Sequence, residues 1–133
     1  MTKKQENRRF LGLDWGEKRI GLALSEAGLN MALPYGVAST LSEVLEVIEE
    51  ERIDLIVMGA PFKMRGAQES MNPHFLEFLE TLKKRVKVPV ELIDERLSSK
   101  AADALEGSYK DNKAPRDAVA AMLILQGYLD KQK

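Results

Sequence analysis

The feature of this sequence that most constrains its fold is a change of hydrophobic period near residue 40. Before that point, apolar runs over residues 9–14 and 19–25 are separated by a short connection that contains glycine, a pattern typical of a β-hairpin. A third strand is expected near residues 31–38, where Pro34 would confine it to a sheet edge or a bulge. The chain is therefore predicted to open with antiparallel strands.

Beyond residue 40, helical and strand-like patterns alternate. The segment Thr40-Leu41-Ser42-Glu43 matches the capping box that begins a helix, and Asn72-Pro73 supplies an N-cap followed by proline at the first helical position. Continuous apolar runs over residues 54–59 and 88–94 indicate two more strands, the first of them covered on both faces. Strands and helices that alternate in this way predict a sheet that also contains parallel strands.

Two further helices complete the predicted order β-β-β-α-β-α-β-α-α. A short helix is expected over residues 98–105, and a last helix runs from Pro115 to about Asp130. The order predicts a mixed sheet with helices on its faces. The 133 residues are expected to form a single domain, 1–133, in which residues 1–8 are a flexible basic N-terminus.

The composition excludes several kinds of catalytic site. The chain has no cysteine, which excludes a disulfide framework, a zinc finger and a thiol nucleophile. Its one histidine, His74, is expected to face solvent, so hydrolytic chemistry is expected to depend on carboxylates. The net charge of −1 argues against a uniformly basic nucleic-acid coat. No apolar run approaches the roughly 20 residues of a membrane span, and a cytoplasmic protein is expected.

Acidic residues stand where the predicted strands end. Asp14 closes the first strand, Asp94 and Glu95 close the last one, and Asp117 lies in the first turn of the final helix. Residues at strand ends gather at one edge of a sheet flanked by helices. Asp117 is predicted to face the sheet, because it shares one helical stripe with three residues further along: Ala121, Leu125 and Tyr128.

Each of these acids also has a purely structural interpretation. Asp14 could begin a turn, Asp117 could complement the helix dipole, and Asp94 or Glu95 could pair with Arg96 at the surface. Acids from distant segments that converge on one edge would repel one another unless a cation lay among them. Without histidine or thiolate ligands, oxygen donors favour Mg²⁺ or Mn²⁺.

Basic residues are concentrated in the segments expected near this edge. They are Lys18, Arg19, Lys63, Arg65, Arg96, Lys100, Lys113 and Arg116. The predicted helix over residues 40–52 is instead rich in glutamate and would repel phosphate. The edge is therefore predicted to bind a nucleic-acid backbone, with a solvated surface of mixed charge as the alternative. Trp15 is interpreted as a packing residue rather than a platform for base stacking.

Four segments together resemble the YqgF/RuvX family of the RNase H-like superfamily. They are residues 14–21, 59–66, 94–99 and 117–129, and they occur in the family's order. The resemblance covers about residues 9–129. It implies an RNase H-like α/β fold, with a five-stranded mixed sheet whose opening strands are antiparallel and whose later strands are parallel, and with helices on both faces.

The resemblance also implies a nuclease site that holds Mg²⁺ or Mn²⁺, with two ions expected. The family's catalytic and metal-binding acids correspond to Asp14, Glu95 and Asp117. Asp94 is the first alternative to Glu95, because a slip of one residue exchanges the two faces of a strand. The chain departs from the family's usual pattern at Lys63 and Arg65, where Asn and Asp are common.

The implied function is processing of the 5′ end of precursor 16S ribosomal RNA, and resolution of Holliday junctions is the alternative. An ATP-handling domain of the actin and sugar-kinase kind would need two such domains, and 133 residues supply one. A non-catalytic nucleic-acid adaptor is the third hypothesis, and the three acids argue against it. The expected partner is structured RNA or branched DNA and no membrane, and the expected state is a monomer or weak homodimer.

Overall fold

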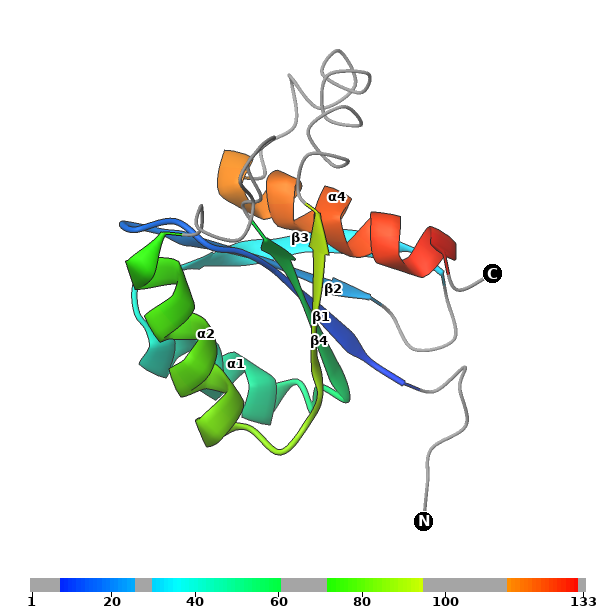
Figure 1. The fold of residues 1–133 in the computed structure, drawn as a ribbon. Coiled ribbons are helices and arrows are strands. Elements are labelled where there is room, and N and C mark those ends of the chain that lie inside the picture. Colours follow the sequence, from blue (N-terminus) through cyan, green and yellow to red (C-terminus); the bar gives the residue numbers. More distant parts are fainter. Residues whose placement is uncertain (1–7, 26–29, 61–71, 95–114, 132–133) are drawn as a thin grey trace.

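A five-stranded mixed sheet forms the centre of the computed structural model, which describes residues 8–25, 30–60, 72–94 and 115–131 (Figure 1). Its strands are β1 (Phe10–Asp14), β2 (Ile20–Ser25), β3 (Ala32–Ala38), β4 (Leu55–Ala60) and β5 (Val90–Asp94). The strand order is β3-β2-β1-β4-β5. β2 pairs antiparallel with β1 and with β3, whereas β4 pairs parallel with β1 and with β5. The predicted mixed sheet is confirmed.

The described helices begin where the sequence places their caps. They are α1 (Leu41–Glu50), α2 (Pro73–Arg85) and α4 (Arg116–Lys131). The Thr40 hydroxyl accepts a hydrogen bond from the Glu43 backbone N–H at 3.2 Å, and the Asn72 side chain accepts one from the His74 backbone N–H at 2.7 Å. His74 is exposed, as expected. The short helix predicted over residues 98–105 lies outside the described residues.

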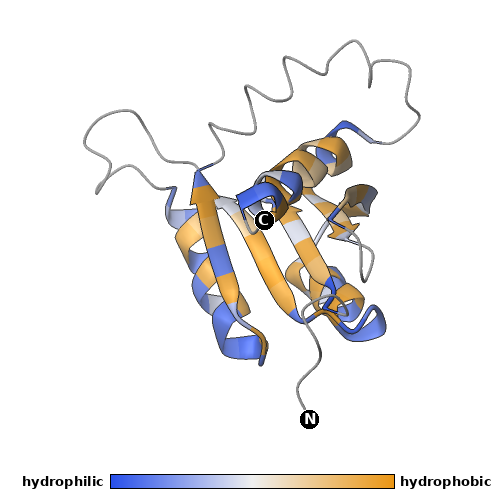
Figure 2. Cartoon of the chain, turned by 90° about the vertical axis from the view of Figure 1, so that its right-hand side faces the viewer, coloured by the Kyte–Doolittle hydropathy of each residue, from blue (hydrophilic) through white to orange (hydrophobic). Residues whose placement is uncertain are grey.

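The helices cover the sheet on both faces (Figure 1). α1 and α2 pack on one face, against a cluster that includes Leu11, Leu13 and Met58. α4 packs on the other, against a cluster that includes Phe10 and Val57. Figure 2 shows that the strands are mostly apolar and that the helices mix apolar and polar residues. No helix within the described ranges has both the length and the apolarity that crossing a membrane requires.

β3 is an outer strand of the sheet, as Pro34 led us to expect. Leu22 of β2 lies opposite Gly36, but the next residue, Ala23, lies opposite Pro34, so Tyr35 is an extra residue in β3. This irregularity is a β-bulge beside the proline. Proline has no backbone N–H, and the sheet tolerates that loss best at a bulge in an outer strand. The expectation of an edge strand or a bulge is confirmed in both respects.

Candidate functional site

The first strand delivers Asp14 to the end of the sheet. Asp14 is the last residue of β1, is partly buried, and lies opposite Gly21 of β2. Side chains alternate along a strand, and Phe10 belongs to the cluster under α4 whereas Leu11 and Leu13 belong to the opposite one. Asp14 is therefore placed on the face that α4 covers.

Two glycines allow α4 to lie directly on this face of the sheet. A Cβ atom added to Gly12 would lie 2.7 Å from the Leu125 Cβ and 2.9 Å from the Ala121 carbonyl oxygen. A Cβ added to Gly21 would overlap the backbone carbonyl of Asp117. The first turn of α4 thus rests on Gly21, the residue that faces Asp14 across the strand pair, so Asp14 and Asp117 both adjoin Gly21.

The sequence pattern did not reveal the role of Gly21. Its signal was available: a glycine stands opposite the acid in the predicted hairpin. The expectation that Asp117 lies on the sheet-facing side of its helix is supported by this contact, and Ala121 and Leu125 of the same stripe are fully buried. Trp15, next to Asp14, packs edge to face on Phe75 of α2 with 5.7 Å between ring centroids, which confirms it as a packing residue.

Arg19 forms an ion pair with Asp117. Its Nε donates to Asp117 Oδ2 at 2.7 Å, and the two side chains are 66% and 34% exposed. Arg19 is predicted to contact a nucleic-acid backbone, and in the structure its guanidinium has an acidic partner at the site. Lys18 and Arg116, which adjoin these residues in the chain, are exposed. The remaining predicted backbone contacts lie outside the described residues: Lys63, Arg65, Arg96, Lys100 and Lys113.

Asp94 reaches the same end of the sheet as Asp14 but lies on the opposite face. It is the last residue of β5 and pairs with Ala60 at the end of β4, which runs parallel to β1. Ile93 packs in the cluster under α4, and Leu92 packs in the opposite one. Alternation therefore places Asp94 on the α1 and α2 side, the face opposite Asp14. Glu95 lies outside the described residues.

The two acids that adjoin Gly21 carry donors of a type that suits a hard cation. Asp14 and Asp117 offer carboxylate oxygens, the ligand type preferred by Mg²⁺ and Mn²⁺. Within the described ranges, no three side chains of Asp, Glu, His or Cys are grouped so that they could hold a metal ion. The third predicted ligand, Glu95, is outside those ranges. Two acids beside a cationic side chain at the open end of a sheet could hold a cation and receive a phosphate group.

Comparison with known proteins gives a family match over almost the whole chain. The family model described as "RuvX: Holliday junction resolvase" matches residues 8–131. A protein of Syntrophomonas wolfei named "Putative pre-16S rRNA nuclease" is 38% identical, and the alignment covers 92% of this chain and 94% of that protein. A protein of Rickettsia africae with the same name is 34% identical over 96% of this chain and 89% of its own length.

Solved structures with a similar fold include Thermus thermophilus RuvC. The complex of that protein with a Holliday junction substrate aligns with a TM-score of 0.61 and covers 94% of this chain and 95% of the RuvC chain, at 19% identity. A second T. thermophilus RuvC structure aligns with a TM-score of 0.59 at 18% identity and covers 93% of this chain and 95% of that chain. At this level of identity the likeness concerns the fold, which is RNase H-like.

Proposed function

Because this chain belongs to the RuvX family and is a nuclease that hydrolyses phosphodiester bonds of nucleic acids, we propose that it processes the 5′ end of precursor 16S ribosomal RNA with the help of divalent metal ions. The observation that carries the proposal is the placement of Asp14 and Asp117 on either side of Gly21. An enzyme that acts on this substrate would work in the cytoplasm.

We propose that Asp14, Asp117 and Glu95 hold Mg²⁺ or Mn²⁺. Bound ions of this kind activate a water molecule and stabilise charge on the phosphoryl and leaving oxygens. Glu95 is preferred to Asp94, because the packing of Leu92 and Ile93 in β5 supports a position of Asp94 on the face opposite Asp14. The direct packing of α4 on Gly21 supports a fixed position for Asp117.

The basic residues have the task of binding the substrate backbone in this proposal. Lys18 and Arg116 are exposed, and they precede Arg19 and Asp117 directly in the chain. The other proposed contacts are Lys63, Arg65, Arg96, Lys100 and Lys113. Contacts with phosphates give no information about base sequence, so the recognition of one precursor end would depend on RNA shape. Arg19 fixes the Asp117 carboxylate and keeps a positive charge next to it.

A cleavage panel tests this function. Labelled precursor 16S RNA, an unstructured single-stranded RNA and a four-way DNA junction are each incubated with Mg²⁺, Mn²⁺ or a chelator. We expect cleavage near the precursor 5′ end with either metal and none in chelator. Preferential cutting of the junction would replace the proposal with resolvase activity, and cleavage that persists in chelator would refute the metal mechanism. The Asp14→Asn variant, purified in parallel, controls for contaminating nucleases.

A further inference from the structure

The exposed large apolar side chains of the described residues are concentrated on and beside one strand. Met31, Leu33, Tyr35 and Val37 are 55%, 43%, 44% and 38% exposed. These four residues are called the β3 patch below. Leu76 on α2 is the one further large apolar residue with comparable exposure in the described ranges. Clusters of exposed apolar side chains on a soluble protein often mark an interaction site.

The position of β3 explains why the patch is uncovered. β3 is an outermost strand, and α4 packs along it on one face, whereas α1 touches it at few points on the other. Leu33 lies opposite Leu24, on the α1 side of the sheet, and Val37 lies opposite Gly21, on the α4 side. The patch therefore wraps around the outer edge. A Cβ added to Gly36 would meet no atom within 4 Å, so the surface is open there.

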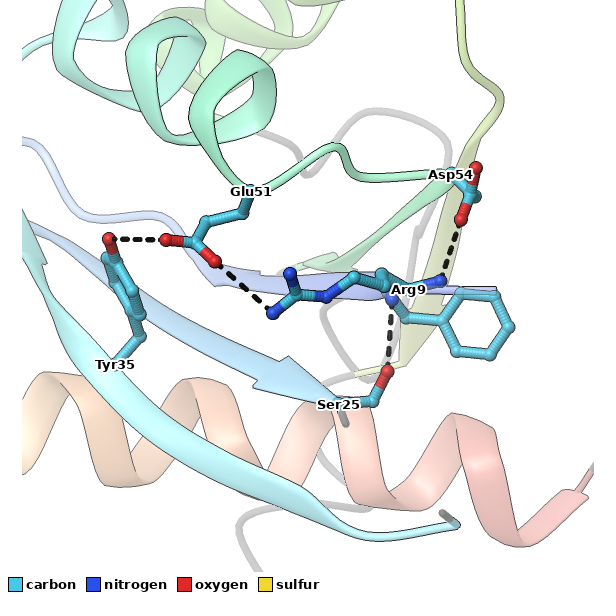
Figure 3. Close-up of polar contacts among 6 residues, drawn as sticks. Arg9, Ser25, Tyr35, Glu51 and Asp54 are labelled. Atoms are coloured by element: carbon cyan, nitrogen blue, oxygen red, sulfur yellow. Dashed lines mark hydrogen bonds and ion pairs between the residues drawn. The ribbon is translucent and has the colours of Figure 1, made fainter. Parts of the chain in front are cut away.

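Tyr35 is held in place by a charged network. Its hydroxyl donates to Glu51 Oε2 at 3.3 Å, and Glu51 Oε1 lies 3.2 Å from the Arg9 guanidinium (Figure 3). Partial desolvation and the charge of Glu51 raise the pKa of the Tyr35 hydroxyl. A tyrosine whose orientation is fixed can bind a partner with little loss of side-chain entropy.

The backbone of β3 is protected against pairing with another strand. Pro34 has no N–H, Tyr35 forms a bulge, and the Ala32 N–H donates to Gln126 Oε1 at 2.9 Å. Such features prevent edge-to-edge association with a second copy. The side chains of the β3 patch, rather than its backbone, are therefore the groups that a partner can contact.

The charges beside the patch select the partner's chemistry. Glu51 contacts Tyr35, and Glu43 accepts a hydrogen bond from the Ser39 N–H just after β3, at 2.6 Å. α1 and its C-terminal end carry one arginine, Arg52, against five acids: Glu43, Glu46, Glu49, Glu50 and Glu51. Arg9 is already paired with Glu51. This side of the molecule repels a nucleic-acid backbone and attracts cations.

We propose that the β3 patch, flanked by the acidic α1, docks a basic segment of a protein partner whose apolar side chains lie on Leu33 and Tyr35. The proposal is independent of the nuclease function, because the two anchors Leu33 and Tyr35 lie toward α1, whereas Asp14 and Asp117 adjoin Gly21 on the face that α4 covers. Docking here would attach the enzyme to a basic protein and leave the carboxylate edge open to substrate.

The test uses a synthetic peptide in which valine alternates with lysine, and a peptide of equal length in which glutamate replaces lysine. Binding to the full chain is followed by calorimetry and by amide chemical shifts. We expect the lysine peptide to bind and to shift amides of β3 and α1, and the glutamate peptide not to bind. Leu33→Ser should weaken binding about tenfold, as expected for an apolar anchor, and Leu76→Ser is the matched control. Glu46→Gln with Glu50→Gln should weaken binding and reduce its salt dependence.

Several outcomes would overturn the proposal. Equal binding of the two peptides, or equal loss in Leu33→Ser and Leu76→Ser, would show nonspecific apolar adhesion. A dimer seen by sedimentation and lost in Leu33→Ser would assign the patch to a second copy. Amide shifts on β3 caused by single-stranded RNA would assign it to nucleic acid. Melting temperatures confirm that each variant is folded, and Leu33→Ser should keep the cleavage activity of the unmodified protein.

Discussion

Nε of Arg19 donates a hydrogen bond to Oδ2 of Asp117 at 2.7 Å, joining the connection between β1 and β2 to the first turn of α4. The contact fixes an acid that arrives from far along the chain and whose backbone packs on Gly21, the residue opposite Asp14. It also places a positive charge next to that acid. A metal ion that bound Asp117 would compete with this guanidinium.

The first prediction concerns that competition. Arg19→Gln should increase the affinity for Mn²⁺, because the substitution frees Asp117 and removes a positive charge near it. An ion pair this exposed contributes about 0.3–1 kcal/mol, or about two- to fivefold in a binding constant. Mn²⁺ titration without nucleic acid measures the change. Lys18→Gln removes the same charge from the neighbouring residue, and an equal effect there would show that the pair with Asp117 has no part in it.

The second prediction concerns the contact that positions α4. Gly21→Ala should destabilise the protein by about 1–3 kcal/mol, because the new methyl group overlaps the Asp117 carbonyl and the helix must move. The cleavage rate of the folded protein should also fall, since the displaced residue is a proposed metal ligand. Gly36→Ala is the control: its methyl group meets open space, and replacing a strand glycine gains up to about 1 kcal/mol. Denaturant unfolding of both variants, followed by single-turnover cleavage, checks the prediction, which fails if they behave alike.

The third prediction separates Glu95 from Asp94. If strand alternation decides which acid serves the site, Glu95→Gln should reduce cleavage about a hundredfold or more, a loss typical of removing a major electrostatic contribution. Asp94→Asn should have a much smaller effect on the chemical step, because its register position is on the opposite face. Single-turnover rates at saturating substrate distinguish the two. The reverse ranking would make Asp94 the ligand.

The fourth prediction concerns substrate binding by Lys63 and Arg65. Replacing both with alanine should weaken binding to all sequences alike, because phosphate contacts carry no base sequence. The slope of log affinity against log salt should decrease by about one unit for each lost contact. The rate of the chemical step at saturating substrate should persist. If the double variant binds normally but cuts slowly, these residues act in catalysis instead of in binding.

Much of the fold follows from local patterns in the sequence. The apolar runs, the Thr40 and Asn72 caps and the shift from strand to helix period each depend on neighbours a few residues apart. Pro34 predicted that β3 lies at a sheet edge or contains a bulge, because a proline cannot donate a hydrogen bond to a central ladder. The family resemblance added the RNase H-like fold and the proposed roles of the acids.

The arrangement around the carboxylates depended on contacts between distant segments. The sequence placed Asp14 and Asp117 at element ends, but only packing shows that α4 rests on Gly21, and only side-chain geometry shows that Arg19 pairs with Asp117. The exposure of Leu33 and Tyr35 was likewise hidden, since an apolar residue in a strand is normally expected to be buried. Local periodicity determines which face a side chain takes, whereas the covering of that face depends on how far a separate helix extends across the sheet.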